Sequence, residues 1–301
     1  MNFPDIAFLN HRFGAAGRIA FRTGKAGLPI VALVNSYGSC ETSLYGGQVL
    51  EYRPTGHVPV LFTSKQAVYE PGKPIRGGIP VCWPWFGPNP DKALPQHGFA
   101  RILQWSLQAT EYSSDVTELQ LMLSDSELTR RYWPYAFELT LRVRLGQSLS
   151  ITLTTANRDT RTFTLTQAIH PYFRVRQVRD VTVGGLDNAP YSDLLTRRSA
   201  TQKGVLNIRS ETDRIYTPVS LECALHDPGL GRVIALTYAG TKRLVVWNPW
   251  IDKARALSDF DDDEYARMLC IEPVNTEDDA VTLAPGEQHT LSLAVQATLL
   301  P

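Results

Sequence analysis

The stretch that decides the fold class is Phe137-Glu-Leu-Thr-Leu-Arg-Val-Arg-Leu-Gly-Gln-Ser-Leu-Ser-Ile-Thr-Leu-Thr-Thr155. From Phe137 to Leu145 every second side chain is apolar and the intervening ones are Glu, Thr or Arg, which is the period of a strand with one buried face. The alternation resumes from Ser148 to Thr155. Gly146-Gln147 between the two runs suits a two-residue type II′ turn, so we predict an antiparallel hairpin.

Further strand-like runs surround this hairpin. They occur at 31–34, 118–123, 162–168, 219–225, 232–238, 243–247, 268–272 and 289–298. Helix candidates are few and short, the best being 125–132 and 258–268, the second with Ser258 as its cap. Many strands joined by Gly- and Pro-rich turns indicate a sandwich or barrel. We predict an all-β protein, a single domain over 1–301 built as one large antiparallel β-sandwich.

The charge balance excludes several classes of partner. Thirty basic and thirty acidic residues give a formal net charge of zero, so no global field attracts nucleic acid or an anionic membrane. We therefore expect neither partner, and any anion site must be local.

Composition and cysteine spacing indicate the compartment. The first fourteen residues lack the pattern of a signal peptide, and there is no apolar run of eighteen residues, so we expect a cytoplasmic protein. The four cysteines lie far apart without a Cys-x-x-Cys pair, which predicts free, mostly buried thiols and no zinc ribbon. A monomer is the default expectation for the oligomeric state.

Two neighbouring segments carry the densest set of unusual residues. They are Arg76-Gly-Gly-Ile-Pro-Val-Cys-Trp-Pro-Trp-Phe-Gly87 and Gln96-His-Gly-Phe-Ala-Arg101. The paired glycines permit close backbone approach, and the aromatic residues offer flat faces for a sugar ring. Arg76 and Arg101 are able to converge on one anion, because each guanidinium presents a planar fork of donors. The alternatives are that the aromatic residues belong to the core and that the arginines are surface residues.

Three titratable residues are candidates for chemistry. His170 precedes a proline at the end of a strand-like run and titrates near neutrality, as a proton donor does. Glu272 ends the apolar run that begins at Met268, where an ionised carboxylate needs a partner or a purpose. Asp213 is as well suited to accept sugar hydroxyl groups as to cap a turn. The acidic cluster 259–264 lacks the spacing of a calcium loop and is interpreted as a solvated helix start.

Five segments in order resemble the hexose-6-phosphate mutarotases of the aldose-1-epimerase superfamily. They are Arg-Gly-Gly-Ile-Pro with a nearby Pro-x-Phe-Gly, Gln-His-Gly-Phe-Ala-Arg, His-Pro-Tyr-Phe, Val-Trp-Asn-Pro-Trp and Ile-Glu-Pro, between Arg76 and Asn275. The resemblance implies a galactose-mutarotase-like supersandwich with no cofactor and no metal. His170 matches the catalytic histidine of the family and Glu272 its catalytic carboxylate. Arg76, Gln96, Arg101 and Asp213 match substrate-binding positions, with His97 beside them in the substrate wall.

The implied activity is that of a glucose-6-phosphate 1-epimerase, which interconverts the α and β anomers of hexose 6-phosphates. Glu272 would take the proton of the anomeric hydroxyl and protonated His170 would give one to the ring oxygen. Two alternatives remain at this point. One is a non-catalytic carbohydrate-binding or regulatory protein, and the other is a glycosidase that uses Asp213 with Glu272 as its two carboxylates.

Overall fold

The computed structural model describes residues 3–218 and 220–300 and confirms the all-β architecture. The predicted hairpin forms as β8 (Phe137–Leu145) and β9 (Leu149–Asn157), which pair antiparallel, with the alternate apolar side chains of β8 buried. The prediction of a two-residue type II′ turn at Gly146-Gln147 is wrong. Leu145 pairs with Leu149, so 146–148 form the turn, and Gly146 does not adopt the positive φ that a type II′ turn requires.

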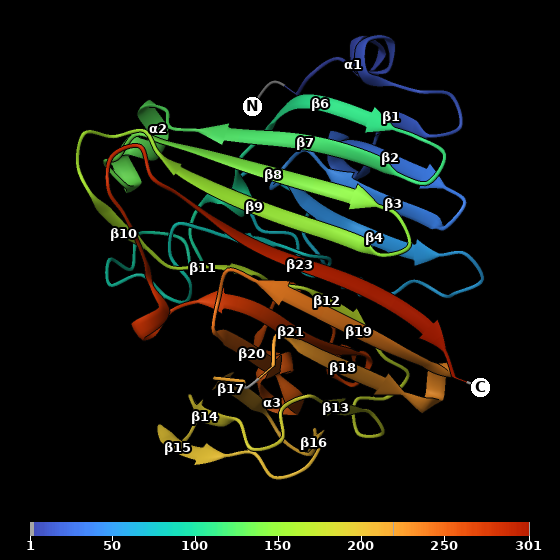
Figure 1. Ribbon diagram of the computed structural model, residues 1–301, viewed down its shortest axis with the longest axis vertical. Helices are drawn as coiled ribbons and strands as arrows, with labels where there is room; N and C mark the ends of the chain where they lie inside the picture. The colour runs from blue at the N-terminus through green and yellow to red at the C-terminus, as the bar shows by residue number, and fades with distance from the viewer. Residues whose placement is uncertain (1–2, 219, 301) are drawn as a thin grey trace.

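The hairpin belongs to a nine-stranded antiparallel sheet. Figure 1 shows β23 in red crossing the middle of this sheet between β9 and β19. In spatial order the strands are β16 (Leu206–Asn207), β13 (Thr182–Gly184), β18 (Glu222–Asp227), β19 (Arg232–Ala239), β23 (Gln288–Leu299), β9, β8, β7 (Thr117–Ser124) and β6 (Ser106–Tyr112).

Two further sheets form the layer that faces it. The first contains β15 (Arg198–Thr201), β14 (Pro190–Asp193), β17 (Thr212–Tyr216), β20 (Arg243–Asn248), β21 (Met268–Asn275), β11 (Gln167–Ile169) and β5 (Val81–Cys82), with β12 (Tyr172–Arg174) also paired to β21. The second contains β1 (Ile19–Thr23), β2 (Pro29–Asn35), β3 (Gly38–Ser43) and β4 (Gln48–Pro54). A separate pair joins β10 (Phe163–Leu165) to β22 (Val281–Leu283).

Both sheets of the second layer cover the same face of the nine-stranded sheet. β2 and β3 contact β7 and β8, whereas β11 and β21 contact β23. The apolar faces meet in one continuous buried cluster that runs from Leu9 to Val295, and its burial is the main stabilising contribution. The predicted β-sandwich is therefore confirmed, and we propose from this continuous core that the chain forms a single domain.

Helices are short connectors, as expected, but only one of the two predicted helices forms. The α-helices are α1 (Ile6–Phe13), α2 (Glu127–Tyr132) and α3 (Trp250–Ala256), and the 3₁₀ turns are Lys25–Gly27, Ala100–Ile102, Pro228–Leu230, Glu264–Arg267 and Glu277–Asp279. α2 confirms the candidate at 125–132, with Ser126 as its N-cap. Within the described residues no helix has the length and apolar character that crossing a membrane requires.

The predicted helix at 258–268 is wrong, and the acidic cluster is not a solvated helix start. The chain forms turns there, followed by the 3₁₀ turn that begins at Glu264. Glu264 is buried and its carboxylate accepts backbone N–H bonds from Lys65 (2.9 Å) and Asp261 (3.2 Å). Asp259 binds Arg76. These carboxylates are used in tertiary contacts, which local helix signals do not reveal.

Two predicted strands differ in extent. The run 162–168 divides into β10 and β11, because the backbone N–H of Thr166 donates to Pro84 and its hydroxyl accepts from Phe86, which moves the chain from one sheet to another. The run 219–225 is represented by β18, which begins at Glu222; Val219 lies outside the described residues.

β21 continues past Glu272 to Asn275, although a proline follows the glutamate. On one side of β21, β11 pairs only with Val274 and Asn275, and β12 pairs only with 268–270. The interval between those two partners contains Pro273. A proline is tolerated where no neighbouring strand needs its N–H, so Glu272 lies within the strand and not at its end.

Candidate active site

All seven side chains that the sequence singles out line one cavity of about 200 Å³. They are Arg76, Gln96, His97, Arg101, His170, Asp213 and Glu272. A larger hollow, about 590 Å³, lies between α1 and β6, but its lining is mostly apolar and includes none of the seven. Because proton transfer needs titratable groups, we place the site in the smaller cavity.

The cavity lies on the face of the eight-stranded sheet that points away from the sandwich core. Along β21, Leu269 and Ile271 belong to the main core, so the alternate residues Cys270 and Glu272 face the opposite side. Gln167 of β11 donates from its amide to the side chain of Asn275 in β21 (3.0 Å), which joins the strand that leads to His170 to the strand that carries Glu272.

His170 is held at the break between β11 and β12. Its backbone N–H donates to Pro80 (3.1 Å), and that of Tyr172 donates to Gly78 (2.8 Å), so the Arg-Gly-Gly-Ile-Pro loop carries the histidine segment. Gly78 has φ +62°, and a Cβ there would lie 2.2 Å from the carbonyl oxygen of Val49, so only glycine permits this approach.

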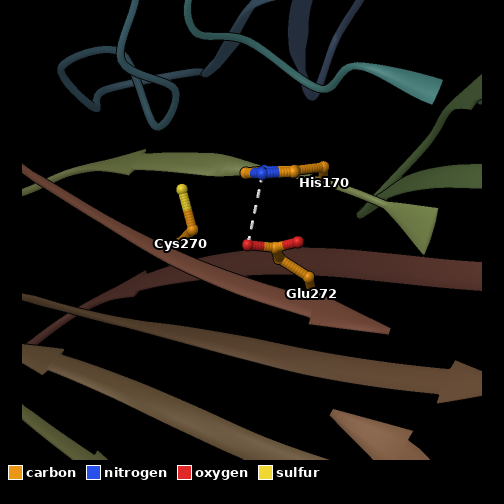
Figure 2. Close-up of side chains that lie close together, drawn as sticks. All are labelled: His170, Cys270 and Glu272. Carbon is orange, nitrogen blue, oxygen red and sulfur yellow. Dashed lines mark ion pairs between the residues drawn. The ribbon is translucent and has the colours of Figure 1, made fainter. Parts of the chain in front are cut away.

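Nε2 of His170 lies 3.4 Å from Oε1 of Glu272 (Figure 2). The two residues are 6% and 1% exposed. Burial, followed by the positive charges of Arg101 and Arg76, lowers the pKa of His170 to about 3. Burial, followed by the charge of Asp213, raises the pKa of Glu272 well above its usual value. Both shifts favour the neutral forms of His170 and Glu272, which together are called the dyad below.

Cys270 lies beside this pair in Figure 2, and the donor atoms of the three residues are within 4.8 Å of one another. The fold thus brings together a His, a Cys and a Glu that the sequence spacing did not indicate. Cys270 packs with Phe62 and Met268, and burial raises the pKa of its thiol well above the usual value. Because a metal binds the thiolate, this environment disfavours a metal site.

Arg76 is already paired. Its guanidinium donates through Nε and Nη2 to Asp259, with Nη2 3.0 Å from Oδ1, and through Nη1 to the hydroxyl of Tyr172 (3.2 Å). Asp259 and Tyr172 are functional candidates that the sequence-based assignment missed. Tyr172 stands in the His-Pro-Tyr-Phe segment and was detectable there, whereas nothing local links Asp259 to an arginine 183 positions earlier.

Arg101 is buried, 8% exposed, and has no carboxylate within ion-pair distance among the described residues. Its Nη2 donates to the backbone carbonyl of Gln96 (2.7 Å), and its Nε has no partner. Arginine stays protonated in proteins, so the cavity wall contains a guanidinium charge without a direct ion-pair partner in the described residues. The side chain of Gln96 is exposed at the mouth of the cavity.

His97 is fixed beside the dyad. Its ring Nδ1 accepts a hydrogen bond from the backbone N–H of Gly87 (3.1 Å), and the backbone N–H of His97 donates to the carbonyl of Gly87 (2.7 Å). Its ring centroid lies 5.8 Å from that of His170. Burial and the charge of Arg101 lower the pKa of His97 well below its usual value. The neutral ring therefore carries its proton on Nε2.

Asp213 enters the cavity from β17. Burial raises its pKa to about 6. Lys253 and Leu257, at α3, also line the cavity, and Lys253 forms an ion pair with Glu211 (3.4 Å). Asp213 pairs with Trp247 of β20, and Glu272 pairs with Val245 of the same strand, so the two carboxyl groups reach the cavity from the strands on either side of β20.

Of the two alternatives for the aromatic residues of 76–87, the core holds for Trp83 and Trp85 and the cavity for Phe86. Trp83 is completely buried in the core, where its indole N–H donates to Thr155 (3.0 Å), and Trp85 packs against the same core. Only Phe86 of the three reaches the cavity. Trp247, at the end of β20, provides the flat wall instead, with its ring 6.3 Å from that of His170. The pleat of β20 turns the Trp247 side chain towards the cavity. The sequence segment Val-Trp-Asn-Pro-Trp already contained this tryptophan.

Residues 29–296 match the aldose 1-epimerase family. The chain therefore belongs to this family and is an epimerase, as the five segments predicted. Family membership favours an enzyme over a non-catalytic carbohydrate-binding protein and over a glycosidase.

The relatives narrow the class. A protein of Cenchrus ciliaris provisionally named glucose-6-phosphate 1-epimerase is 38% identical over 284 residues, which cover 90% of this chain and 85% of the relative. A Salmonella typhimurium protein with the same provisional name is 34% identical over 234 residues, 77% of this chain and 78% of the relative. A Salmonella typhimurium crystal structure provisionally described as a mutarotase has a TM-score of 0.89 at 28% identity, covering 95% and 96% of the two chains.

Proposed function

We propose that this protein is a hexose-6-phosphate mutarotase that acts on glucose 6-phosphate. The observation that carries the proposal is that one cavity contains a buried proton-transfer pair and a buried cation without a carboxylate partner. The names of the relatives support the same substrate.

Among the residues that the structure describes, three buried polar atoms of the cavity wall have no hydrogen-bond partner: Nδ1 of His170, Oε2 of Glu272 and Nε of Arg101. Buried polar groups are normally hydrogen-bonded, so groups left without partners in a cavity indicate what a ligand supplies. A hexose 6-phosphate has hydroxyl groups at its anomeric end and an anion at the other end. Its two ends match the dyad and the arginine.

The reaction needs one proton removed from the anomeric hydroxyl and one delivered to the ring oxygen, so that C1 opens to the aldehyde and closes on either face. We propose that Glu272 is the base and His170 the acid, with their roles exchanged on closure. The neutral pair holds the proton required. Transfer from Glu272 to His170 produces the carboxylate and imidazolium without any net change of charge, and each positioned group contributes ~10²–10⁴-fold.

The remaining wall residues are proposed to bind the sugar. Asp213 is placed to accept hydroxyl protons, His97 to donate from Nε2, and Gln96 to contact the substrate at the cavity mouth. Trp247 and Phe86 provide apolar faces for the ring. Arg101 and Arg76 are proposed to bind the phosphate.

Anomeric exchange of glucose 6-phosphate tests the function directly. We expect the protein to increase the exchange rate between the α and β signals in NMR above the spontaneous rate in the same buffer. The absence of any acceleration for every hexose phosphate tried would rule out the proposal.

Metal independence is a second expected result. The thiol environment of Cys270 disfavours a metal site, and the dyad supplies both proton transfers. Exhaustive chelation should therefore leave the catalysed rate unchanged. Loss of the rate on chelation, with recovery after addition of a divalent ion, would contradict the mechanism.

We also propose that the protein acts as a monomer in the cytosol. One chain supplies both the dyad and the anion site. All four cysteines are free and buried, as is common for proteins of a reducing compartment.

A further inference from the structure

Arg76 and Arg101, the two guanidinium groups that define the positive end of the cavity, differ in their partners. Arg76 donates to Asp259 over 3.0 Å, whereas Arg101 has only a backbone carbonyl as partner and leaves its Nε unsatisfied. Both guanidinium groups line the cavity that contains the dyad. An anion bound there would pair with a guanidinium that has no carboxylate within ion-pair distance in the described part of the chain.

Tyr172 connects this end of the cavity with His170. Its hydroxyl accepts from Nη1 of Arg76 (3.2 Å), and its ring lies parallel to the His170 ring with centroids 4.8 Å apart at 9°. The tyrosine is 2% exposed and is packed at both ends. Movement of the Arg76 guanidinium towards an anion therefore acts on the ring that fixes the imidazole.

The charges act on His170 as well. Glu272, His97 and Tyr172 lie against its ring, and the two arginines line the same cavity. After burial, the positive charges of Arg101 and Arg76 are the largest causes of its lowered pKa. A phosphate dianion at this end of the cavity offsets that effect on His170, because charge effects in a buried site are weakly screened. Arg101 also lowers the pKa of Glu272, so the anion favours the protonated form of both groups and acts through the acid, His170.

We propose that the phosphate of the substrate switches on the dyad from the anion site, so that a separate inorganic oxyanion accelerates mutarotation of an unphosphorylated sugar. This inference rests on the proposed function and goes beyond it. If the phosphate contributed only binding energy, it would increase the rate only when covalently attached to the sugar. If it activates the dyad through the arginines and Tyr172, a separate oxyanion in the same site also increases the rate.

The test uses glucose as the substrate and phosphite dianion as the separate oxyanion. Glucose 6-phosphate is measured first and must be accelerated; if it is not, the proposed function itself is wrong. Glucose exchange is then followed by NMR at increasing phosphite concentrations, and the protein-free rate at each concentration is subtracted. We expect a saturable increase of roughly tenfold or more, because one pKa unit changes the protonated fraction of His170 about tenfold.

Variants show whether the phosphite effect depends on Arg101 and on the hydroxyl of Tyr172. Arg101→Ala should abolish the phosphite effect, and Tyr172→Phe, which keeps the stacked ring but loses the hydroxyl, should reduce it. Arg142→Ala, at an exposed position on β8, is the matched control and should retain it. The phosphite titration of the unmodified protein is decisive without any variant. Acceleration of glucose 6-phosphate together with no phosphite effect on glucose overturns the inference, even if phosphite inhibits the phosphosugar reaction.

Discussion

Glu272→Gln and His170→Ala are each expected to lower kcat for glucose 6-phosphate by about 10²–10⁴-fold, the usual contribution of one positioned acid or base. The Kd for the phosphosugar should stay within about tenfold. The two groups move protons in the transition state and contribute little to ground-state affinity. Exchange NMR gives the rate, and calorimetry gives the affinity.

Glu272→Gln is a more specific test of a catalytic role than His170→Ala. Because burial favours the neutral form of the Glu272 carboxyl group, a neutral amide of nearly the same shape suits the same position. Its melting temperature should therefore remain close to that of the unmodified protein, and lost turnover cannot be assigned to unfolding. Near-normal turnover in either variant contradicts the role assigned to that residue.

Arg101→Ala should lower kcat/KM for glucose 6-phosphate by about 10–150-fold, while activity on unphosphorylated glucose is not reduced. The lost hydrogen bond joins two charged groups and is worth roughly 1.5–3 kcal/mol. Arg76→Ala should cost at least as much, because it also leaves the Asp259 carboxylate unpaired beside the phosphate. Adding Asp259→Asn to that variant should recover part of the loss.

The control for this prediction is stability. If the arginines only brace the surrounding loops, their truncation lowers the melting temperature and harms both sugars equally. An equal fall in kcat/KM on glucose and glucose 6-phosphate would leave the phosphate assignment without support.

The features predicted well from the sequence depend on local periodicity or on ordered motifs. The alternation from Phe137 to Leu145 fixes which face of β8 is buried. The segments around Arg76, His170 and Glu272 converge for two reasons. β11 and β12 both pair with β21, and the Arg-Gly-Gly-Ile-Pro loop accepts a backbone hydrogen bond from His170.

The features that were missed depend on tertiary contacts. The acidic residues near 259 resemble a helix start, yet one of them binds Arg76 and Glu264 caps two backbone N–H groups. Trp83 looks like a sugar-stacking residue until the pleat places it in the core. Cys270 and Glu272 share one face of β21, which brings the thiol beside the dyad.

The protonation states show what geometry adds to a motif. The sequence assigns Glu272 as a base and His170 as an acid, which suggests an ion pair at rest. Burial shifts both pKa values towards the neutral forms. We therefore propose that the imidazolium of His170 forms after the substrate binds, when the phosphate offsets the charges of the arginines.

We propose that the dyad and the two arginines of one cavity bind opposite ends of the same molecule. Anomeric exchange in a single NMR sample that contains both glucose 6-phosphate and glucose, without other oxyanions, tests this proposal. We expect the protein to accelerate α to β exchange of the phosphosugar strongly and that of glucose only weakly. Equal acceleration of both sugars would contradict it.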